Sequence, residues 1–290
     1  MAASMKIGIV PINVGGPETA ERMVETAQYA ESAGIDSVWT FEHVVVPTEY
    51  ESVYPYSRDG KMPIPPEAWF IDPLISLAHV AAATKTIRLG TGVNIFPQAN
   101  PMLFAKQAAS LDVLSGGRLD LGLGIGWLAE EYEAMGTPFG RRGARFDDYL
   151  TAVKKVWAGD VVNHQSDFLS WHDFKSYPLP AQKPHPPILI GGTTNRNLRR
   201  VVESAQGWYA PSDSRKQLAE KTEELKKLAH AHGRPFESIE ICASWRVGRR
   251  PDALPEFEDL GITRVVALLT STGETDAKRA IDVIVSNAGL

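Results

Sequence analysis

The sequence predicts an α/β fold, a closed (β/α)8 TIM barrel with insertions at its rim. Eight short apolar segments each precede a segment with helical spacing, and they lack the alternation of half-exposed strands. A chain of 290 residues fits eight such units in a barrel better than an open sheet. Neither a linker-like change of composition nor a short repeat divides the chain, so we expect one domain, residues 1–290.

The eight units follow one another along the chain in strand-then-helix order. The expected strands cover residues 5–10, 36–41, 87–95, 118–124, 188–190, 208–210, 239–245 and 264–268. The expected helices cover residues 18–32, 71–84, 101–114, 141–157, a segment ending at 205, and residues 214–232, 254–260 and 274–288. Gly34 directly follows the first helix, and glycine at this position is a common helix end.

Three longer connections interrupt this rhythm. Residues 44–66 and 127–140 each follow a strand and precede its helix, which places them on the rim where barrels concentrate function. Residues 159–187, rich in histidine, proline and aromatic residues, follow a helix instead. We expect this third connection to be irregular and to start at the opposite rim.

Composition excludes several classes of protein. A net charge of −5 argues against a nucleic-acid or membrane-surface partner. No apolar run approaches the length of a membrane span, and we find no signal-peptide pattern. The single cysteine, Cys242, lies in an apolar segment, so we expect it to be buried, without a disulfide, in a protein of the reducing cytoplasm.

The strand expected at 118–124 runs into a glycine-rich exit with Gly122, Gly124 and Gly126. Glycines at a strand end let the backbone approach a ligand, because no Cβ stands in the way. They also ease the packing of a tight strand, and the residues alone leave both interpretations open. The spacing of the three glycines does not fit a dinucleotide-binding fingerprint, so we reject a Rossmann fold.

Glu42 and His43 follow the second expected strand at the rim. A histidine in this position can hydrogen-bond a bound ring or move a proton, because its unperturbed pKa lies near neutrality. A structural histidine bonded to a loop carbonyl is the alternative.

Two further strand ends are rich in small residues. Gly92, Val93 and Asn94 follow a Gly-Thr pair, which suggests either a bulge or strained peptide, or an ordinary strand eased by glycine. Gly191, Gly192 and Thr193 precede a helix whose N-terminus favours phosphate. The second turn is equally compatible with a capped turn followed by a solvated basic face, formed by Arg196, Arg199 and Arg200.

The remaining candidates are aromatic and histidine side chains near the rim. Five aromatic residues are candidates for a wall over a flat cofactor: Tyr54, Tyr56, Trp69, Trp127 and Phe139. The histidines other than His43 show no spacing typical of a metal site, so we expect no metal.

Four segments together resemble the bacterial luciferase-like family of flavin and deazaflavin oxidoreductases. They are residues 34–43 (GIDSVWTFEH), 87–93 (IRLGTGV), 111–127 (LDVLSGGRLDLGLGIGW) and 185–192 (HPPILIGG). The resemblance runs across nearly the whole chain, and it is strongest to the branch that depends on coenzyme F420.

This resemblance implies a (β/α)8 barrel with a flavin-type ring across the carboxyl ends of its strands. It implies that Glu42 and His43 lie beside the reactive edge of the ring. It also implies a cis peptide near Gly92-Val93 behind the ring. The cofactor-binding residues that it implies are Gly92, Val93, Asn94, Trp127, Glu130, Gly191, Gly192 and Thr193, of which the last three would hold a phosphate.

The resemblance implies hydride transfer between coenzyme F420 and a small organic substrate, with His43 moving the accompanying proton. An FMN-dependent monooxygenase is the first alternative, and a non-catalytic flavin-binding protein is the second. Trp127 stands where relatives that act on sugar phosphates have an acid, which argues against that substrate. Gln206 replaces the usual aspartate before the sixth strand. By resemblance we also expect a homodimer, formed through apolar helices such as residues 71–84.

Overall fold

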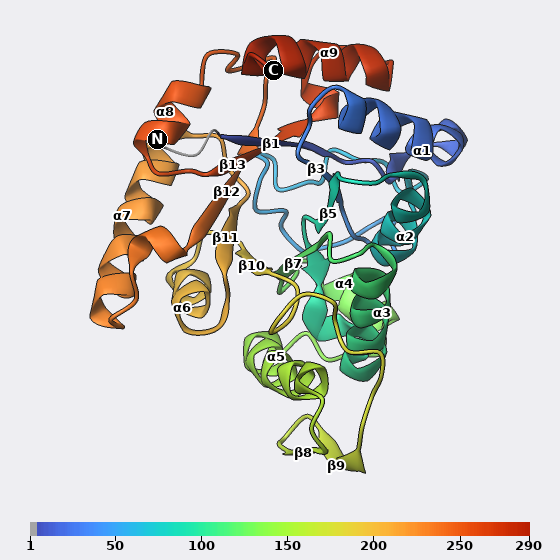
Figure 1. Ribbon diagram of the computed structural model, residues 1–290, viewed down its shortest axis with the longest axis vertical. Coiled ribbons are helices and arrows are strands. Elements are labelled where there is room, and N and C mark those ends of the chain that lie inside the picture. Colours follow the sequence, from blue (N-terminus) through green and yellow to red (C-terminus); the bar gives the residue numbers. More distant parts are fainter. Residues whose placement is uncertain (1–4) are drawn as a thin grey trace.

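The computed structural model describes residues 5–290 and shows a closed ring of eight parallel strands (Figure 1). The ring runs through β1 (Lys6–Val10), β3 (Ser37–Thr40), β5 (Arg88–Thr91), β7 (Leu119–Gly124), β10 (Ile188–Gly191), β11 (Gly207–Ala210), β12 (Glu240–Trp245) and β13 (Arg264–Leu268). Pairing of β10 with β7 and of β13 with β1 closes it. The predicted (β/α)8 barrel is confirmed. Residues 1–4 of the predicted domain lie outside the described residues.

A helix follows each strand of the ring. These helices are α1 (Pro17–Ser32), α2 (Pro73–Ala83), α3 (Pro101–Leu114), α5 (Arg142–Ala158), α6 (Asn195–Ser204), α7 (Arg215–Ala231), α8 (Leu254–Asp259) and α9 (Ala277–Ala288). Local sequence starts many of them, because a capping side chain accepts a backbone N–H that has no partner in the first turn. These caps are Asp72, Asn100, Thr194, Ser214 and Asp276.

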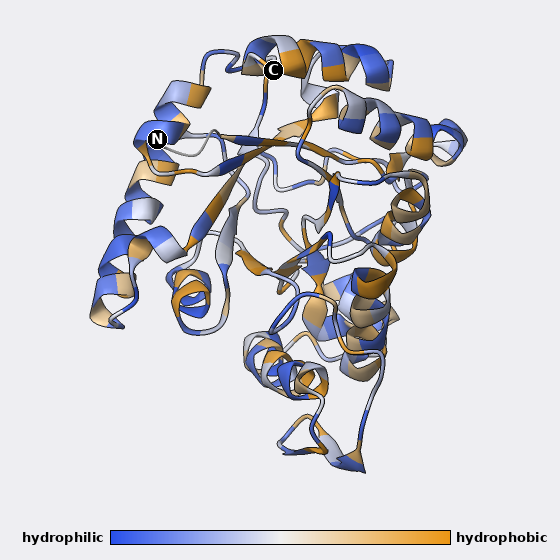
Figure 2. Ribbon diagram, in the orientation of Figure 1, coloured by the Kyte–Doolittle hydropathy of each residue, from blue (hydrophilic) through white to orange (hydrophobic). Residues whose placement is uncertain are grey.

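Two apolar layers stabilise the barrel. The larger lies between the strands and the helices, which carry apolar residues on one side and polar residues on the other (Figure 2). The smaller fills the barrel interior around Trp39 and Tyr209, whose ring centroids lie 5.5 Å apart. Gly90 makes room for this filling, since a Cβ there would stand 2.3 Å from the Trp39 ring.

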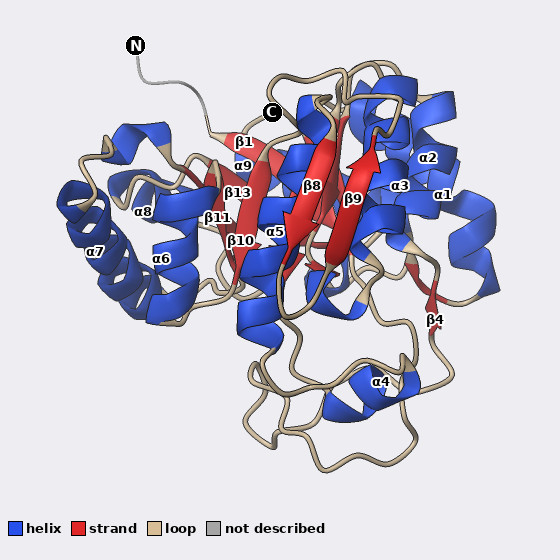
Figure 3. Ribbon diagram, turned by 90° about the horizontal axis from the view of Figure 1, so that it is seen from below, coloured by secondary structure: helices blue, strands red, loops and turns tan. Residues whose placement is uncertain are grey.

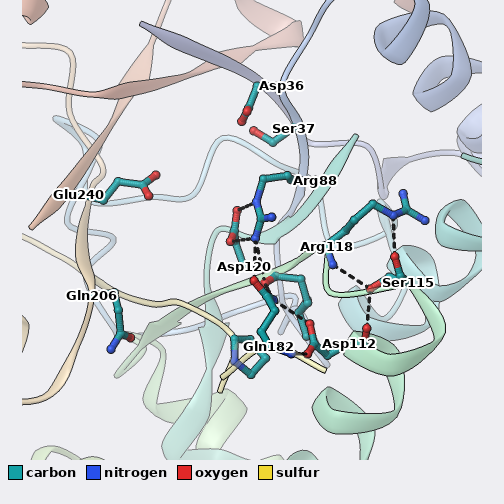
Figure 4. Close-up of polar contacts among 12 residues, drawn as sticks. Asp36, Ser37, Arg88, Asp112, Ser115, Arg118, Asp120, Gln182, Gln206 and Glu240 are labelled. Atoms are coloured by element: carbon teal, nitrogen blue, oxygen red, sulfur yellow. Dashed lines mark hydrogen bonds and ion pairs between the residues drawn. The ribbon is translucent and has the colours of Figure 1, made fainter. Parts of the chain in front are cut away.

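Charged side chains close the amino end of the barrel. Arg264 is 1% exposed and places its Nη1 2.8 Å from Asp120 Oδ2. Arg88 donates to the same carboxylate and lies near Gln182 (Figure 4). Burial alone would raise the pKa of Asp120, but the two guanidinium groups outweigh it and lower the pKa. Because ion pairs fill this end, the carboxyl end is left for a ligand.

The structure differs from the sequence expectation in two segments of the chain. The segment expected at 87–95 is two strands, β5 and β6 (Asn94–Ile95), separated by a cis peptide between Gly92 and Val93. The connection 159–187, expected to be irregular, contains an antiparallel hairpin of β8 (Val162–Gln165) and β9 (Ser170–Phe174), which is visible in Figure 3. The expectation of an irregular connection was wrong, because strands of four and five residues are too short to be recognised from the alternation of polar and apolar residues.

Smaller elements complete the connections. The rim insertion at 127–140 forms the short helix α4 (Ala129–Ala134), which lies among loops at one end of the barrel in Figure 3. Strand β2 (Val14–Gly15) pairs with β4 (Trp69–Phe70), and 3-10 turns cover Phe96–Gln98, Phe236–Ser238 and Leu269–Ser271. Within residues 5–290, every helix is too short or too polar to cross a membrane.

Candidate functional site at the carboxyl end of the barrel

The predicted site residues follow four strands of the ring at the carboxyl end. The pair at 42–43 follows β3, residues 92–94 follow β5, residues 127 and 130 follow β7, and residues 191–193 end β10 or follow it. Direct contacts join the neighbours. The backbone N–H of Ile95 donates to Glu42, and a Cβ on Gly191 would stand 2.8 Å from Val93. The fold therefore brings together segments that are up to about 150 residues apart in the sequence.

His43 is held by a residue that the sequence did not single out. Its Nδ1 lies 2.9 Å from Oε2 of Glu131, a carboxylate whose side chain is 1% exposed. The sequence carried a signal for Glu131, because it lies three residues after the apolar Leu128, a spacing that puts two residues on one face of a helix. The adjacent carboxylate at 130 obscured that signal.

Glu130, which we expect at the cofactor, makes hydrogen bonds to the rim insertion that follows β3. Its Oε1 accepts the backbone N–H groups of Glu51, at 2.7 Å, and Ser52, at 3.2 Å. In return, Ser52 Oγ accepts the N–H of Ala129 at 2.9 Å. Burial opposes ionisation, but hydrogen bonds from Ser52 and neighbouring backbone outweigh it and lower the pKa of Glu130 to about 2. This carboxylate fastens the rim loop, residues 44–66, to α4, and contact with a cofactor stays a prediction.

Glu42 occupies an environment that disfavours its charge. Burial raises its pKa to about 7, against the opposing effect of the N–H of Ile95, and the charge of Glu131 adds to the rise. A carboxyl group with this pKa is protonated in part at neutral pH. It is therefore able to give or take a proton near the mouth of the barrel.

An aromatic cluster borders the mouth. The centroid of Trp127 lies 5.1 Å from that of Tyr54, 5.6 Å from Tyr50 and 6.1 Å from His43. Of the five residues expected to form a wall, Tyr54, Tyr56 and Trp127 form this cluster.

The other two expected wall residues, Phe139 and Trp69, lie elsewhere. Phe139 packs on Tyr132 and under the guanidinium group of Arg142. Trp69 lies in the β2–β4 pair and is 46% exposed. Phe70, the residue after Trp69, contacts His43 edge-on at 5.2 Å.

The glycines at the strand ends surround one side chain. A Cβ on Gly122 would stand 1.9 Å from the carbonyl oxygen of Thr91, and one on Gly124 would stand 2.6 Å from Val93. Gly191 also faces Val93. Of the two interpretations left open for the exit of β7, the structure supports packing, because these glycines admit Val93 and its backbone beneath the mouth.

The turn at 191–193 precedes α6 at the edge of the mouth. Gly192 has φ of 107°, and a Cβ there would collide with Asn197, so the turn requires glycine. Thr194 caps the helix by accepting the N–H of Asn197. The basic residues nearby are not all available to a ligand, because Arg200 is buried and paired with Asp147 at 2.5 Å. Arg196 and Arg199 are exposed.

One buried polar atom fits a polar-edged cofactor at the mouth. Asn94 is 4% exposed, and its Oδ1 is a buried acceptor without a hydrogen-bond partner among the described residues. Such an oxygen is costly unless a ligand or water supplies a donor. The residues present therefore fit a flavin-type ring.

The rim also contains a cavity, and the described residues form no cluster suited to a metal ion. A cavity of about 550 Å³ opens between the two arms of the rim loop, lined by residues 46–51 and 61–66. It lies beside the aromatic cluster, which shares Tyr50 with it, and His43 is not in its lining. In the part of the chain that the structure describes, no three histidine, cysteine or acidic side chains are grouped for a metal ion.

Comparison with known proteins agrees with this architecture. An uncharacterized protein of Mycobacterium tuberculosis is 30% identical over 258 residues, which cover 88% of this chain and 90% of that protein. The oxygenase component of a flavin-dependent trigonelline monooxygenase from Acinetobacter baylyi is 33% identical over 186 residues, 63% of this chain and 46% of that protein. The structure of an F420-dependent secondary alcohol dehydrogenase, in complex with an F420-acetone adduct, superposes with a TM-score of 0.78 at 14% identity over 98% of both chains.

The likeness to the dehydrogenase shows a shared fold. Family membership comes from a model of the luciferase-like monooxygenases, which matches residues 5–253. The matched segment contains every predicted site residue, from Glu42 to Thr193. The chain therefore belongs to the luciferase-like monooxygenase family of flavin-type oxidoreductases.

Proposed function

We propose that this protein is a coenzyme F420-dependent oxidoreductase that transfers hydride to or from a small organic substrate. The observation that carries the proposal is His43, held at 2.9 Å by the buried Glu131 and bordered by Trp127 at the barrel mouth. Such a histidine can move the proton that accompanies hydride transfer. Membership of a family of monooxygenases favours an enzyme over a non-catalytic flavin-binding protein.

The residues of the mouth would share the work of binding. The Oδ1 of Asn94 would accept from an edge of the cofactor ring, while Val93 and its cis peptide with Gly92 would lie behind the ring. Trp127 would border the ring and the substrate. The turn Gly191, Gly192 and Thr193 would bind a phosphate through backbone N–H groups at the start of α6. A bound deazaflavin supplies hydride chemistry, and the barrel supplies orientation and exclusion of water.

An FMN-dependent monooxygenase is the second candidate. It is favoured by the flavin-dependent trigonelline monooxygenase, which is 33% identical over 186 residues. Titration of the purified protein with F420 and with FMN, followed by cofactor fluorescence, separates the two. We expect F420 to bind at least about tenfold more tightly, a difference of about 1.4 kcal/mol. Tight binding of FMN without measurable binding of F420 would overturn the proposal.

Replacing His43 with alanine tests the proposed proton transfer. We expect His43→Ala to leave cofactor affinity nearly unchanged and to lower the rate of hydride transfer about 100-fold, within the usual range for a general acid or base. Single-turnover kinetics with a substrate found by screening measures this step. His230→Ala is the control, because His230 is exposed in the last turn of α7 and has no side-chain hydrogen bond among the described residues. An unchanged rate in His43→Ala would remove His43 from the mechanism.

We also propose that the protein acts as a homodimer in the cytoplasm. Two neighbouring helices expose large apolar side chains: Ile75 on α2 is 64% exposed and Leu103 on α3 is 57% exposed. A second copy of the chain would cover these side chains. The single cysteine is free and buried, which is compatible with a reducing compartment.

A further inference from the structure

We infer that Glu131 is the positioning residue of His43, and that it fixes the tautomer in which Nδ1 carries the proton and Nε2 faces the reaction. The inference deepens the proposed function and rests on it for the role of Nε2. The hydrogen bonds themselves stand independently of the cofactor.

Both oxygens of the Glu131 carboxylate have hydrogen-bond partners. Its Oε1 accepts the backbone N–H of Val44 at 2.6 Å and Nε2 of Gln98 at 3.3 Å, and its Oε2 lies 2.9 Å from Nδ1 of His43. The side chain is 1% exposed. A buried carboxylate is tolerated where donors satisfy it, and an ionised one accepts all three of these bonds.

The arrangement determines which ring nitrogen holds the proton. Since a carboxylate oxygen accepts, Nδ1 of His43 is the donor, and a neutral imidazole then has its lone pair on Nε2. None of the described residues hydrogen-bonds to Nε2. The edge contacts with Phe70 and Trp127 restrict rotation of the ring. When Nε2 takes a proton, the charge that forms on the ring lies next to the carboxylate, as in a carboxylate–histidine pair.

Glu131 also connects the histidine to the rim loop. Val44, the first residue of the loop, donates to Oε1. The adjacent Glu130 holds the loop seven and eight residues further on, through the backbone of Glu51 and Ser52. Two consecutive carboxylates of α4 thus have separate tasks. Glu130 fastens the loop, and Glu131 fastens its first residue together with the imidazole.

Glu131→Gln gives a sharp test because the side chain keeps its size. The N–H of Val44 can only donate, so the amide oxygen of Gln at 131 must face it, and the amide NH2 must face Nδ1 of His43. The ring must then accept at Nδ1 and carry its proton on Nε2. We expect nitrogen NMR of protein labelled with 15N-histidine, at a pH where histidine is neutral, to show Nδ1–H in the wild type and Nε2–H in the variant. The spectrum of His43→Asn assigns the signals.

Turnover supplies the second measurement. We expect Glu131→Gln to lower kcat by about 10-fold to 100-fold while cofactor affinity stays within about twofold, because the substitution removes the accepting nitrogen without changing the walls of the mouth. Glu133→Gln is the matched control, since this exposed residue of the same helix has no side-chain hydrogen bond in the described residues. It should change neither the tautomer nor kcat.

Three results would overturn the inference. They are a wild-type His43 with its proton on Nε2, an unchanged tautomer in Glu131→Gln, and an inverted tautomer without loss of kcat. The first needs no variant, so the test survives if Glu131→Gln fails to fold. The expected tautomers in a protein that binds neither F420 nor FMN would support the positioning by Glu131 and overturn the proposed function alone.

Discussion

Two adjacent residues at the mouth, Glu42 and His43, are held in different ways. Glu42 accepts the backbone N–H of Ile95 and has a pKa raised to about 7 by burial, whereas His43 has an acidic partner on another element. Glu42 therefore retains a proton that most surface carboxyl groups have lost at neutral pH. Glu42 is therefore able to exchange a proton near pH 7.

The raised pKa of Glu42 predicts how stability depends on pH. A pKa of about 7 in the folded state against 4.5 as the reference means that the folded state binds the proton more tightly. This proton stabilises the folded state fully below pH 4.5. Its contribution to the free energy of unfolding, at most about 3 kcal/mol, is lost as the pH rises through 7. Glu42→Gln should lack this loss. Urea unfolding of both proteins at pH 5 and pH 8 measures it, and parallel changes in the free energy of unfolding would contradict the raised pKa.

Among the elements, those with a clear start and a long pattern were predictable. Helix α3 has the predicted bounds because Asn100 caps it and Pro101 opens it. The sequence predicted one strand over residues 87–95, because residue types alone do not show that the strand breaks at Gly92-Val93. The choice of Glu131 over Glu130 depends on the helical phase of α4, which a six-residue helix defines weakly. Phosphate binding by the turn at 191–193 stays a prediction.

The packing of β7 against β5 predicts a large effect of one methyl group. In Gly122→Ala the new Cβ would stand 1.9 Å from the carbonyl oxygen of Thr91, so backbone in the middle of the barrel has to move. We expect a loss of about 2 kcal/mol or more in the free energy of unfolding, from overpacking. Gly140→Ala is the control, because nothing lies within 4 Å of a Cβ there. Thermal and urea unfolding measure both, and equal stabilities would contradict the close approach.

The two ends of the whole molecule have separate roles. The ion pairs of Arg264 and Asp120 fill the amino end, and the interior rings of Trp39 and Tyr209 separate them from the mouth. This arrangement agrees with barrels in general, where one end serves stability and the other carries the site. Outside the barrel, apolar side chains are exposed on the outer surface of α2 and α3.

That outer surface predicts the state of the protein in solution. If Ile75 and Leu103 are covered by a second copy, light scattering coupled to size exclusion should give about twice the mass of one chain. Each of Ile75→Glu and Leu103→Glu should shift the protein towards one chain, because burying a carboxylate in an apolar contact is unfavourable. Val161→Glu is the control, since Val161 is 54% exposed and lies outside both helices. A single-chain mass for the wild type at micromolar concentration would refute the dimer, and circular dichroism would verify that each variant keeps its fold.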